Sequence, residues 1–486
     1  MRTRWELAWL ALVFVVVLGA RTAGADEVVE TYPDGSPKSK TWVDPEGRRN
    51  GRRLEFFEDG KLEVDATDAR DVVDGPYATF HPSGRPALRT TYRGGKLVGK
   101  HVRWDAGGAP VRVATHVEGR LHGKVEHLRG RKPFATQVWK DGEIVTLNGV
   151  PVTPRPRTEL DRVLAAVAAG QPTSATPPKG PTPKDPAVGR DPPGKAPKGD
   201  PTAPPVPEDL AADRVAALRR LMPYRYLCGV PYDDLVFDDE ANRYAQAAAE
   251  ICAALGDITH TPANPGWPPE RYAFAAKGAA SCDLHQLLRA AASIDGYMDD
   301  SDPSNVGRLG RRRWRLNPVM RRTGFGVALS AKGDPFTAMW AMDRDRAQGP
   351  DVDAITFPAQ GWHPASMFRA DDAWRVAPSE RRFPRVDPVA VRVRVTALDA
   401  DLVPAATALP LEAFSVQTEA VGVHPCIIFR PKGVEVRDGA AYWVEVTGRL
   451  NPAKAKQGAP PDLAFAVRFY GAPAADEAPP ADDAGR

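Results

Sequence analysis

Few stretches of this 486-residue chain have residue types and spacings that could do chemistry. Gly189 to Lys195 reads GRDPPGK, which has the glycine and lysine spacing of a loop that binds nucleotide phosphates. Such a loop needs a serine or threonine next and a strand before it, but Ala196 follows, two prolines interrupt and no strand precedes. We therefore interpret this segment as a spacer. The GxSxG, HExxH and Rossmann glycine patterns are missing, and no serine–histidine–aspartate grouping is clear.

The four cysteines also allow only limited chemistry. Cys228, Cys252 and Cys282 lie in one region and Cys426 in another, and no CxxC pair occurs, which makes a zinc ribbon or a thioredoxin-type site unlikely to form. Cys252 falls on the apolar face of a predicted helix, so we expect it in the core. One disulfide among the first three and a set of buried thiols remain equal alternatives.

The elements of the central region follow from apolar periodicity. A first helix carries Val215, Leu218, Leu221 and Met222 on one face, and a second carries Tyr244, Ala248, Ile251, Cys252 and Leu255 and stops at Gly256. We predict a third helix over Asp283–Met298 and two strands around Gly324–Ser330 and Phe336–Met342. Helices that lead into a small sheet indicate an α+β domain.

Five ordered motifs span this domain. They are YRYLCGVP at Tyr224–Pro231, NRYAQAAA at Asn242–Ala249, HTP at His260–Pro262, SCDL at Ser281–Leu284 and GRRRWRLNP at Gly310–Pro318. In this order they resemble the CAP superfamily (cysteine-rich secretory proteins, antigen 5 and plant pathogenesis-related proteins) in its bacterial, exported form. The resemblance implies an α/β/α sandwich with a cleft, which in many members holds two histidines and two acidic residues. Such a set could bind zinc or polarise a water for hydrolysis.

This chain matches that set only in part. His260 matches the first histidine, and Cys282 or its neighbour Asp283 stands at the first glutamate. Asp300 stands for the second glutamate, because Tyr297-x-x-Asp300 resembles the family's WxxE. Arg311 replaces the second histidine.

The arginine decides the expected chemistry. A guanidinium keeps its proton and donates only hydrogen bonds, so Arg311 cannot ligate a metal and would attract carboxylates or phosphates. We therefore expect no zinc cofactor, an anionic small ligand bound by Arg311 and Asp283, and His260 and Asp300 as the only catalytic candidates. The alternatives are a structural ion pair of Arg311 with Asp300 or Asp283, and a capping or core role for His260.

A glycine ladder precedes this domain. Gly51, Gly75, Gly99 and Gly123 are 24 residues apart, and Phe56, Phe80, Trp104 and Leu128 follow them by five positions. A fixed period indicates a repeat array of hairpins in which the aromatic residue packs on the next unit and glycine supplies the positive φ of turns. Segments such as GPYATF at Gly75–Phe80 resemble MORN-type repeats, which implies an elongated curved sheet and an interaction surface for a protein or envelope ligand. Lys132 stands at a glycine position of the last unit, as expected of a capping repeat.

The beginning of the chain predicts export. Arg2 and Arg4 precede an apolar run from Leu7 to Leu18 and an A-x-A site at Ala23–Ala25, a pattern typical of a signal peptide cleaved after Ala25. The alternative is an uncleaved anchor, but the run is shorter than the ~20 residues that span a bilayer. We expect a secreted, periplasmic or cell-envelope protein without a later transmembrane span. The net charge of +3 comes from interspersed charges, so nucleic acid is not an expected partner.

The sequence thus predicts a multidomain protein. The expected parts are a signal peptide (1–25), a MORN-like β-repeat array (26–150), a Pro/Lys/Gly-rich linker (151–206), an α/β/α CAP domain (207–346), a β-sandwich with alternating strands (347–472) and a disordered tail (473–486). Our functional hypothesis is a non-catalytic binding or scaffolding protein of the bacterial envelope with a degenerate CAP cleft. The alternatives are a hydrolase or peptidase that uses His260 and acidic neighbours, and a lipid- or sterol-binding protein.

Overall fold

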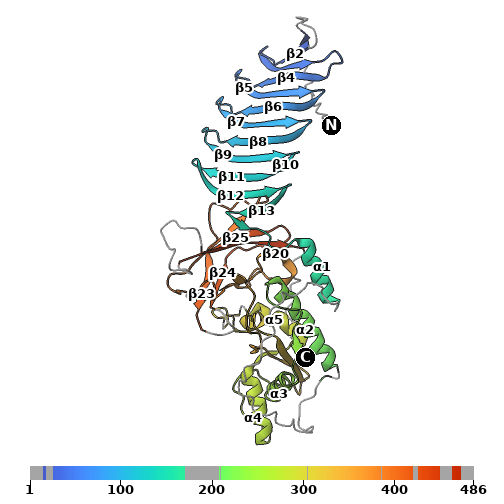
Figure 1. Cartoon of the computed structure of the whole chain (residues 1–486), viewed down its shortest axis with the longest axis vertical. Helices are drawn as coiled ribbons and strands as arrows, with labels where there is room; N and C mark the ends of the chain where they lie inside the picture. Colours follow the sequence, from blue (N-terminus) through green and yellow to red (C-terminus); the bar gives the residue numbers. More distant parts are fainter. Residues whose placement is uncertain are drawn as a thin grey trace, which may run out of the picture. The chain divides into compact units, whose positions relative to one another are not determined.

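The computed structural model describes residues 15–17, 26–169, 207, 209–300, 302–303, 305–384, 386–419, 425–448 and 462–471. The chain divides into two compact units, Met1–Val152 and Thr153–Arg486. The structure is mostly β, with one long sheet and several smaller ones (Figure 1). Most of the predicted linker, from residue 170 to 206, and the predicted tail lie outside the described residues.

The first unit is one antiparallel sheet whose strands follow one another in chain order (Figure 1). Its strands are β1 (Val15–Val17), β2 (Asp26–Thr31), β3 (Pro37–Val43), β4 (Arg49–Phe56), β5 (Leu62–Ala69), β6 (Val72–Phe80), β7 (Pro86–Arg93), β8 (Lys96–Trp104), β9 (Pro110–Val117), β10 (Arg120–Leu121), β11 (Gly123–Arg129), β12 (Lys132–Lys140), β13 (Glu143–Leu147) and β14 (Val150–Pro151). Strand β1 lies within the stretch that the sequence predicts to be a signal peptide.

Two kinds of turn alternate along the repeats of this sheet. One kind ends in a left-handed glycine, such as Gly84, whose amide donates to the carbonyl oxygen of His81 at 2.7 Å. The other is a tight turn with two left-handed residues, such as Arg70 and Asp71. Gly75, which we expected in a turn, lies inside β6 instead. The position requires glycine, because a Cβ there would approach Thr67 Cβ to 2.9 Å.

A column of residues in the repeat sheet combines buried small side chains with half-buried polar ones. Arg53, Tyr77 and His101 recur every 24 residues and face Ala66, Thr90 and Ala114 across the strand pairs. Tyr77 contacts Tyr92 and His101 contacts His116, with ring centroids 5.6 and 5.3 Å apart. The predicted aromatic ladder at Phe56, Phe80 and Trp104 is only half-buried.

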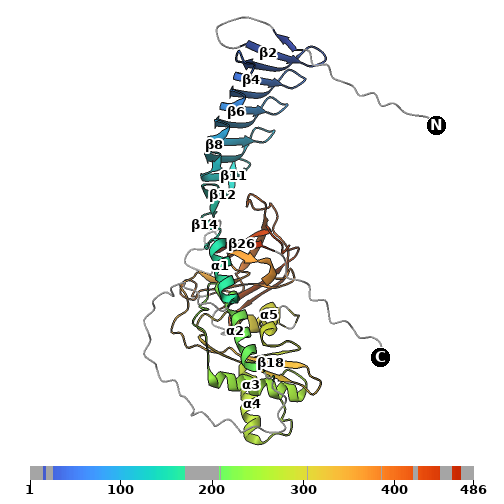
Figure 2. The ribbon, with the colours of Figure 1, turned by 90° about the vertical axis from the view of Figure 1, so that its right-hand side faces the viewer.

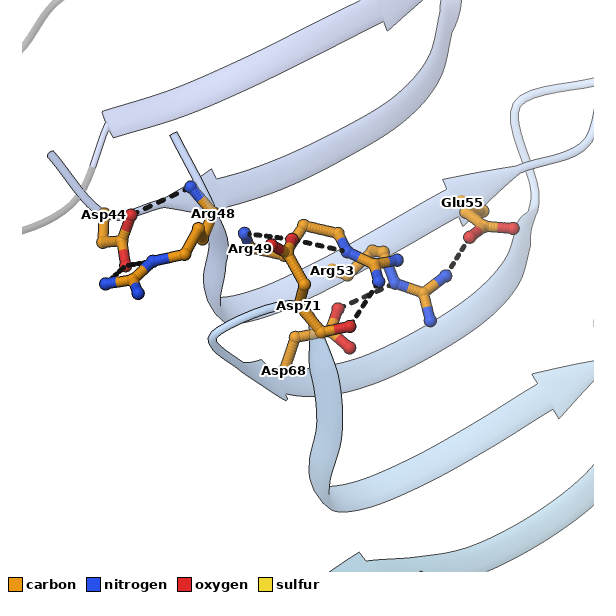
Figure 3. Close-up of polar contacts among 7 residues, drawn as sticks. All are labelled: Asp44, Arg48, Arg49, Arg53, Glu55, Asp68 and Asp71. Carbon is orange, nitrogen blue, oxygen red and sulfur yellow. Dashed lines mark hydrogen bonds and ion pairs between the residues drawn. The ribbon is translucent and has the colours of Figure 1, made fainter. Parts of the chain in front are cut away.

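Figure 3 shows how ion pairs extend this column near the start of the sheet. Arg53 donates to Asp68 at 2.9 Å and also contacts Glu55, and the Asp68 side chain is almost fully buried. In the pairs of Arg48 with Asp44 and of Arg49 with Asp71, the arginine side chain is more exposed than that of Arg53. Exposed pairs stabilise little, whereas both side chains of the Arg53–Asp68 pair are largely withdrawn from solvent.

The second unit begins with helices around a four-stranded sheet of order β15-β17-β18-β16. The helices are α1 (Arg157–Ala168), α2 (Leu210–Leu227), α3 (Asp239–Leu255), α4 (Pro269–Ser281), α5 (Ala290–Asp299) and α6 (Gly310–Arg315). The strands are β15 (Val236–Phe237), β16 (Cys282–Gln286), β17 (Arg322–Leu329) and β18 (Pro335–Trp340).

Helices cover both faces of this sheet. On one face, α3 and α4, which lie side by side (Figure 2), share a core with Ala328 and Ala338. On the other, α2 and α5 share a core with Phe325, Val327 and Met339. The predicted helix over Asp283–Met298 is wrong in its first part, because residues 282–286 pair with β18 and the helix starts only at Ala290.

Two further four-stranded sheets complete the second unit and share one core with α1, α2 and α5. They contain β19 (Ala354–Phe357), β21 (Trp374–Pro378), β24 (Cys426–Pro431) and β23 (Leu411–Gln417), and β20 (Gly361–Pro364), β26 (Leu463–Tyr470), β25 (Ala441–Thr447) and β22 (Arg392–Leu398). A short 3-10 helix, η1 (Ala365–Met367), follows β20. His363 is buried in β20.

All four cysteines are buried free thiols, so the structure favours that alternative over a disulfide. Within the described residues, no helix is long and apolar enough to cross a membrane.

Candidate functional site

A cavity of about 450 Å³ in the second unit is lined by several charged residues that could bind a ligand. It lies where α2, α5 and the start of α6 meet β16, β19 and η1. Its lining residues are Arg220, Tyr224, His285, Leu288, Ala292, Asp295, Gly296, Met298, Asp299, Asp300, Asp302, Arg311, Phe357, Ser366, Met367, Phe368, Arg369 and Asp372.

Helix α5 supplies one wall through its 3.6-residue period. Asp295 and Asp299 are one turn apart and therefore share a face. Arg220 and the Tyr224 hydroxyl both donate to Asp295 Oδ1 at 2.7 Å, which fixes this carboxylate. Gly296 lies between them because a Cβ there would approach His285 Nε2 to 2.5 Å.

Asp300 and Arg311 meet inside this cavity. Arg311 Nη1 lies 3.6 Å from Asp300 Oδ1 and 3.8 Å from Asp302 Oδ2. Asp300 Oδ2 accepts the backbone N–H of Arg312 at 3.2 Å, whereas its buried Oδ1 accepts no hydrogen bond from the described residues. Burial raises the pKa of Asp300 to about 7, although Arg312 and Arg311 act in the opposite direction.

Asp372 enters the same cavity from the segment after η1. Its Oδ2 accepts the backbone N–H of Arg369 at 2.9 Å, and its Oδ1 has no hydrogen-bond partner among the described residues. Burial raises the pKa of Asp372 to about 8, with Arg312 lowering it and the charge and hydrogen bond of Asp299 raising it further. A carboxyl of this kind holds its proton near neutral pH.

Arg312 lies close enough to these two carboxyl groups to oppose the rise in their pKa. Its side chain is fully buried and donates to the carbonyl oxygens of Met298, Asp299 and Ala373. The guanidinium also lies over the ring of Phe357, 4.8 Å from its centroid. Arg312 therefore ties the end of α5 to the start of β21, and Asp299, Asp300 and Asp372 lie beside these attachment points.

The other predicted site residues lie elsewhere. His260 is exposed, and its Nδ1 donates to the carbonyl oxygen of Ala279 at 2.7 Å. Asp283 is buried in an ion pair with Arg315 and does not line the cavity. Cys282 lies on the face of the sheet opposite to that of Asp283, in the core with α3 and α4. The structure thus joins Arg311 with Asp300 but separates them from His260 and Asp283.

No protein-family model and no curated protein matches this chain.

The chemistry of the cavity is that of carboxyl groups. Five aspartates and three arginines line the cavity, with His285 as the one histidine among the lining residues. In the described part of the chain, no group of three or more histidine, cysteine or acidic residues is arranged to hold a metal ion. The carboxyl groups can accept hydrogen bonds, bind a cation or exchange protons near neutral pH.

Sequence reasoning missed Asp295, Asp299 and Asp372. The acidic run DDSD at residues 299–302 is a visible signal for part of this set. Asp372 lies in the region that we assigned to a separate β-sandwich, so only the shared core of the second unit brings it to α5.

Proposed function

We propose that this protein is an exported, non-catalytic binding protein of the bacterial envelope with a degenerate CAP-type cleft. The ordered motifs are the ground for the CAP assignment, and helices pack on both faces of the central sheet as an α/β/α arrangement requires. The repeat sheet would act as the scaffold that docks a protein or envelope partner, as its resemblance to MORN repeats implies.

One observation carries the binding role. In the place of a second cleft histidine, Arg311 forms ion pairs with Asp300 and Asp302, and the first candidate histidine, His260, does not line the cavity. A cavity without paired imidazoles lacks the ligand set of a zinc hydrolase. Its abundant carboxyl groups instead suit recognition of a polar ligand by hydrogen bonds.

A zinc titration by calorimetry on the full chain tests this proposal. The full chain is needed because the core is continuous from α1 to β26. We expect no zinc binding with a Kd in the micromolar range or tighter, either in the wild type or in His260→Ala. Micromolar binding that vanishes in His260→Ala would contradict the proposal and favour a metal-dependent hydrolase.

A hydrolase that uses carboxyl groups is the second candidate, because Asp300 and Asp372 have a pKa near neutrality in one cavity. Turnover of fluorescently labelled casein that survives His260→Ala but is lost in Asp300→Asn would establish it. The charged lining of the cavity disfavours the lipid or sterol alternative.

A further inference from the structure

We propose that the cavity recognises a ligand through an ammonium group, received by the buried Oδ1 atoms of Asp300 and Asp372, which accept no hydrogen bond from the described residues. This inference rests on the proposed binding function and names the class of ligand. It differs from the anionic ligand that Arg311 alone indicated.

The balance of charges in the lining is the first argument. The five aspartates outnumber the three arginines, and each arginine already has an acidic partner. The pairs are Arg220 with Asp295, Arg311 with Asp300 and Asp302, and Arg369 with Asp371. An anion would therefore have to displace a carboxylate from its arginine, whereas a cation would meet carboxyl groups that can ionise as it binds.

The buried carboxyl oxygens are the second argument. Asp300 and Asp372 are 2% and 4% exposed, and the Oδ1 atom of each lacks a hydrogen-bond partner among the described residues. A buried acceptor without a donor costs about 1–3 kcal/mol. An ammonium group brings three N–H donors and no acceptor, so it satisfies such oxygens without adding an unpaired group.

The rest of the lining fits the remainder of such a ligand. Leu288, Met367 and Phe368 add apolar surface to the cavity, which suits a hydrocarbon chain next to the charged group. The volume of about 450 Å³ accommodates a small organic molecule.

Proton release is the expected signature of binding. The charges of Arg312, Arg311 and the more distant Asp283 act on Asp300, and its pKa of about 7 leaves it partly protonated at neutral pH. Asp372 faces Arg312 and Asp299, and its pKa is about 8. A bound cation favours the ionised form of each carboxyl group, so binding should release protons and strengthen as the pH rises from 6 to 8.

Three probes of equal length separate the charge classes: pentane-1,5-diamine, pentane-1,5-diol and glutarate. Each is titrated into the full chain by calorimetry, in two buffers with different ionisation enthalpies so that released protons are counted. We expect the diamine to bind with proton release and the diol and the glutarate dianion to bind at least about tenfold more weakly.

Variants then locate the binding. Asp300→Asn and Asp372→Asn should each weaken diamine binding about tenfold, the loss of roughly one charged hydrogen bond. Asp257→Asn, at an exposed position after α3, should leave it unchanged. The second cavity variant keeps the test valid if the first fails to fold.

Two outcomes would overturn the inference. If glutarate binds more tightly than the diamine, the ligand class is wrong but the binding function stands. If the diamine binds equally to the wild type and to both cavity variants, its binding site lies elsewhere on the protein. The zinc and casein experiments decide the binding function independently of either result.

Discussion

At the scale of single residues, buried arginines join segments that are far apart in the second unit. Arg225 is fully buried and donates to the carbonyl oxygens of Pro231, Arg315 and Asn317 at 2.7 to 3.0 Å. Arg312 does the same between α5 and β21. A planar guanidinium can reach several carbonyl groups at once, which an ammonium group on a flexible chain cannot.

Arg312→Lys should therefore destabilise the protein although the charge is kept. The lysine retains one of the carbonyl contacts at most, so we expect the free energy of unfolding to fall by about 2–3 kcal/mol. Urea unfolding measures this loss, and Arg308→Lys at an exposed position of the same segment is the control. Equal stability of the two variants would contradict the role of Arg312.

Residue prediction succeeded only where the local sequence determined the contact. Arg311 and Asp300 were expected to pair as one alternative, because both stand in motifs of one small domain, and they do pair. Asp372 was not foreseen, because its place depends on the packing of β21 against α5 and α6. No local pattern encodes that contact.

At the scale of elements, helix α3 packs directly against the backbone of β17. Gly324 and Gly326 alternate on this face, and a Cβ at Gly326 would lie 2.3 Å from the carbonyl oxygen of Ala245. The alanine-rich face of α3 completes this close packing, with Ala245, Ala248 and Ala249 fully buried. Small residues on both sides thus set the distance between helix and sheet.

Gly326→Ala should be strongly destabilising, because the added methyl group meets backbone atoms that cannot move independently. We expect a loss of about 3 kcal/mol or more, with a lower melting temperature. Gly307→Ala is the control, since no atom lies within 4 Å of a Cβ at that position. A melting temperature for Gly326→Ala equal to that of this control would refute the packing argument.

Prediction of elements followed the strength of their periodicity. The helices α2 and α3 and the two strands β17 and β18 appear at the expected positions, although Val215 of the predicted α2 face is exposed. Strand β16 was assigned to a helix, because its alternation of apolar and polar residues is short and its partner β18 is distant in sequence. The 24-residue period predicted the hairpins, but the polar column was missed, since we took the aromatic ladder as the core.

At the scale of the whole molecule, the two units bury different titratable groups. In the first unit, burial and the neighbouring His116 lower the pKa of His101 to about 4, and burial also lowers the pKa of His116. In the second unit, burial raises the pKa of Asp300 and Asp372 and lowers that of His363 to about 3. We therefore expect the His101–His116 pair of the repeat sheet to resist protonation.

Acidification should destabilise the protein partly through His101. The folded state keeps this imidazole neutral, while the unfolded chain binds a proton below pH 6.5, so the stabilisation present above pH 6.5 is lost as the pH falls toward 4. His101→Gln should reduce the slope of unfolding free energy against pH between 7 and 5, as measured by urea unfolding. Thr115→Gln, at an exposed and non-titrating position of β9, should keep the wild-type slope. An unchanged slope in His101→Gln would contradict this assignment.

The alternating turns of the repeat sheet also affect how the number of repeats can change during evolution. Arg53, Tyr77 and His101 occupy equivalent positions, and their partners Ala66, Thr90 and Ala114 shift by the same 24 residues. A gene duplication or loss of one such length would place each strand beside a neighbour of the same kind and preserve every turn. Selection can therefore adjust the length of the repeat sheet in steps of one hairpin, while the residues of the cavity in the other unit stay unchanged.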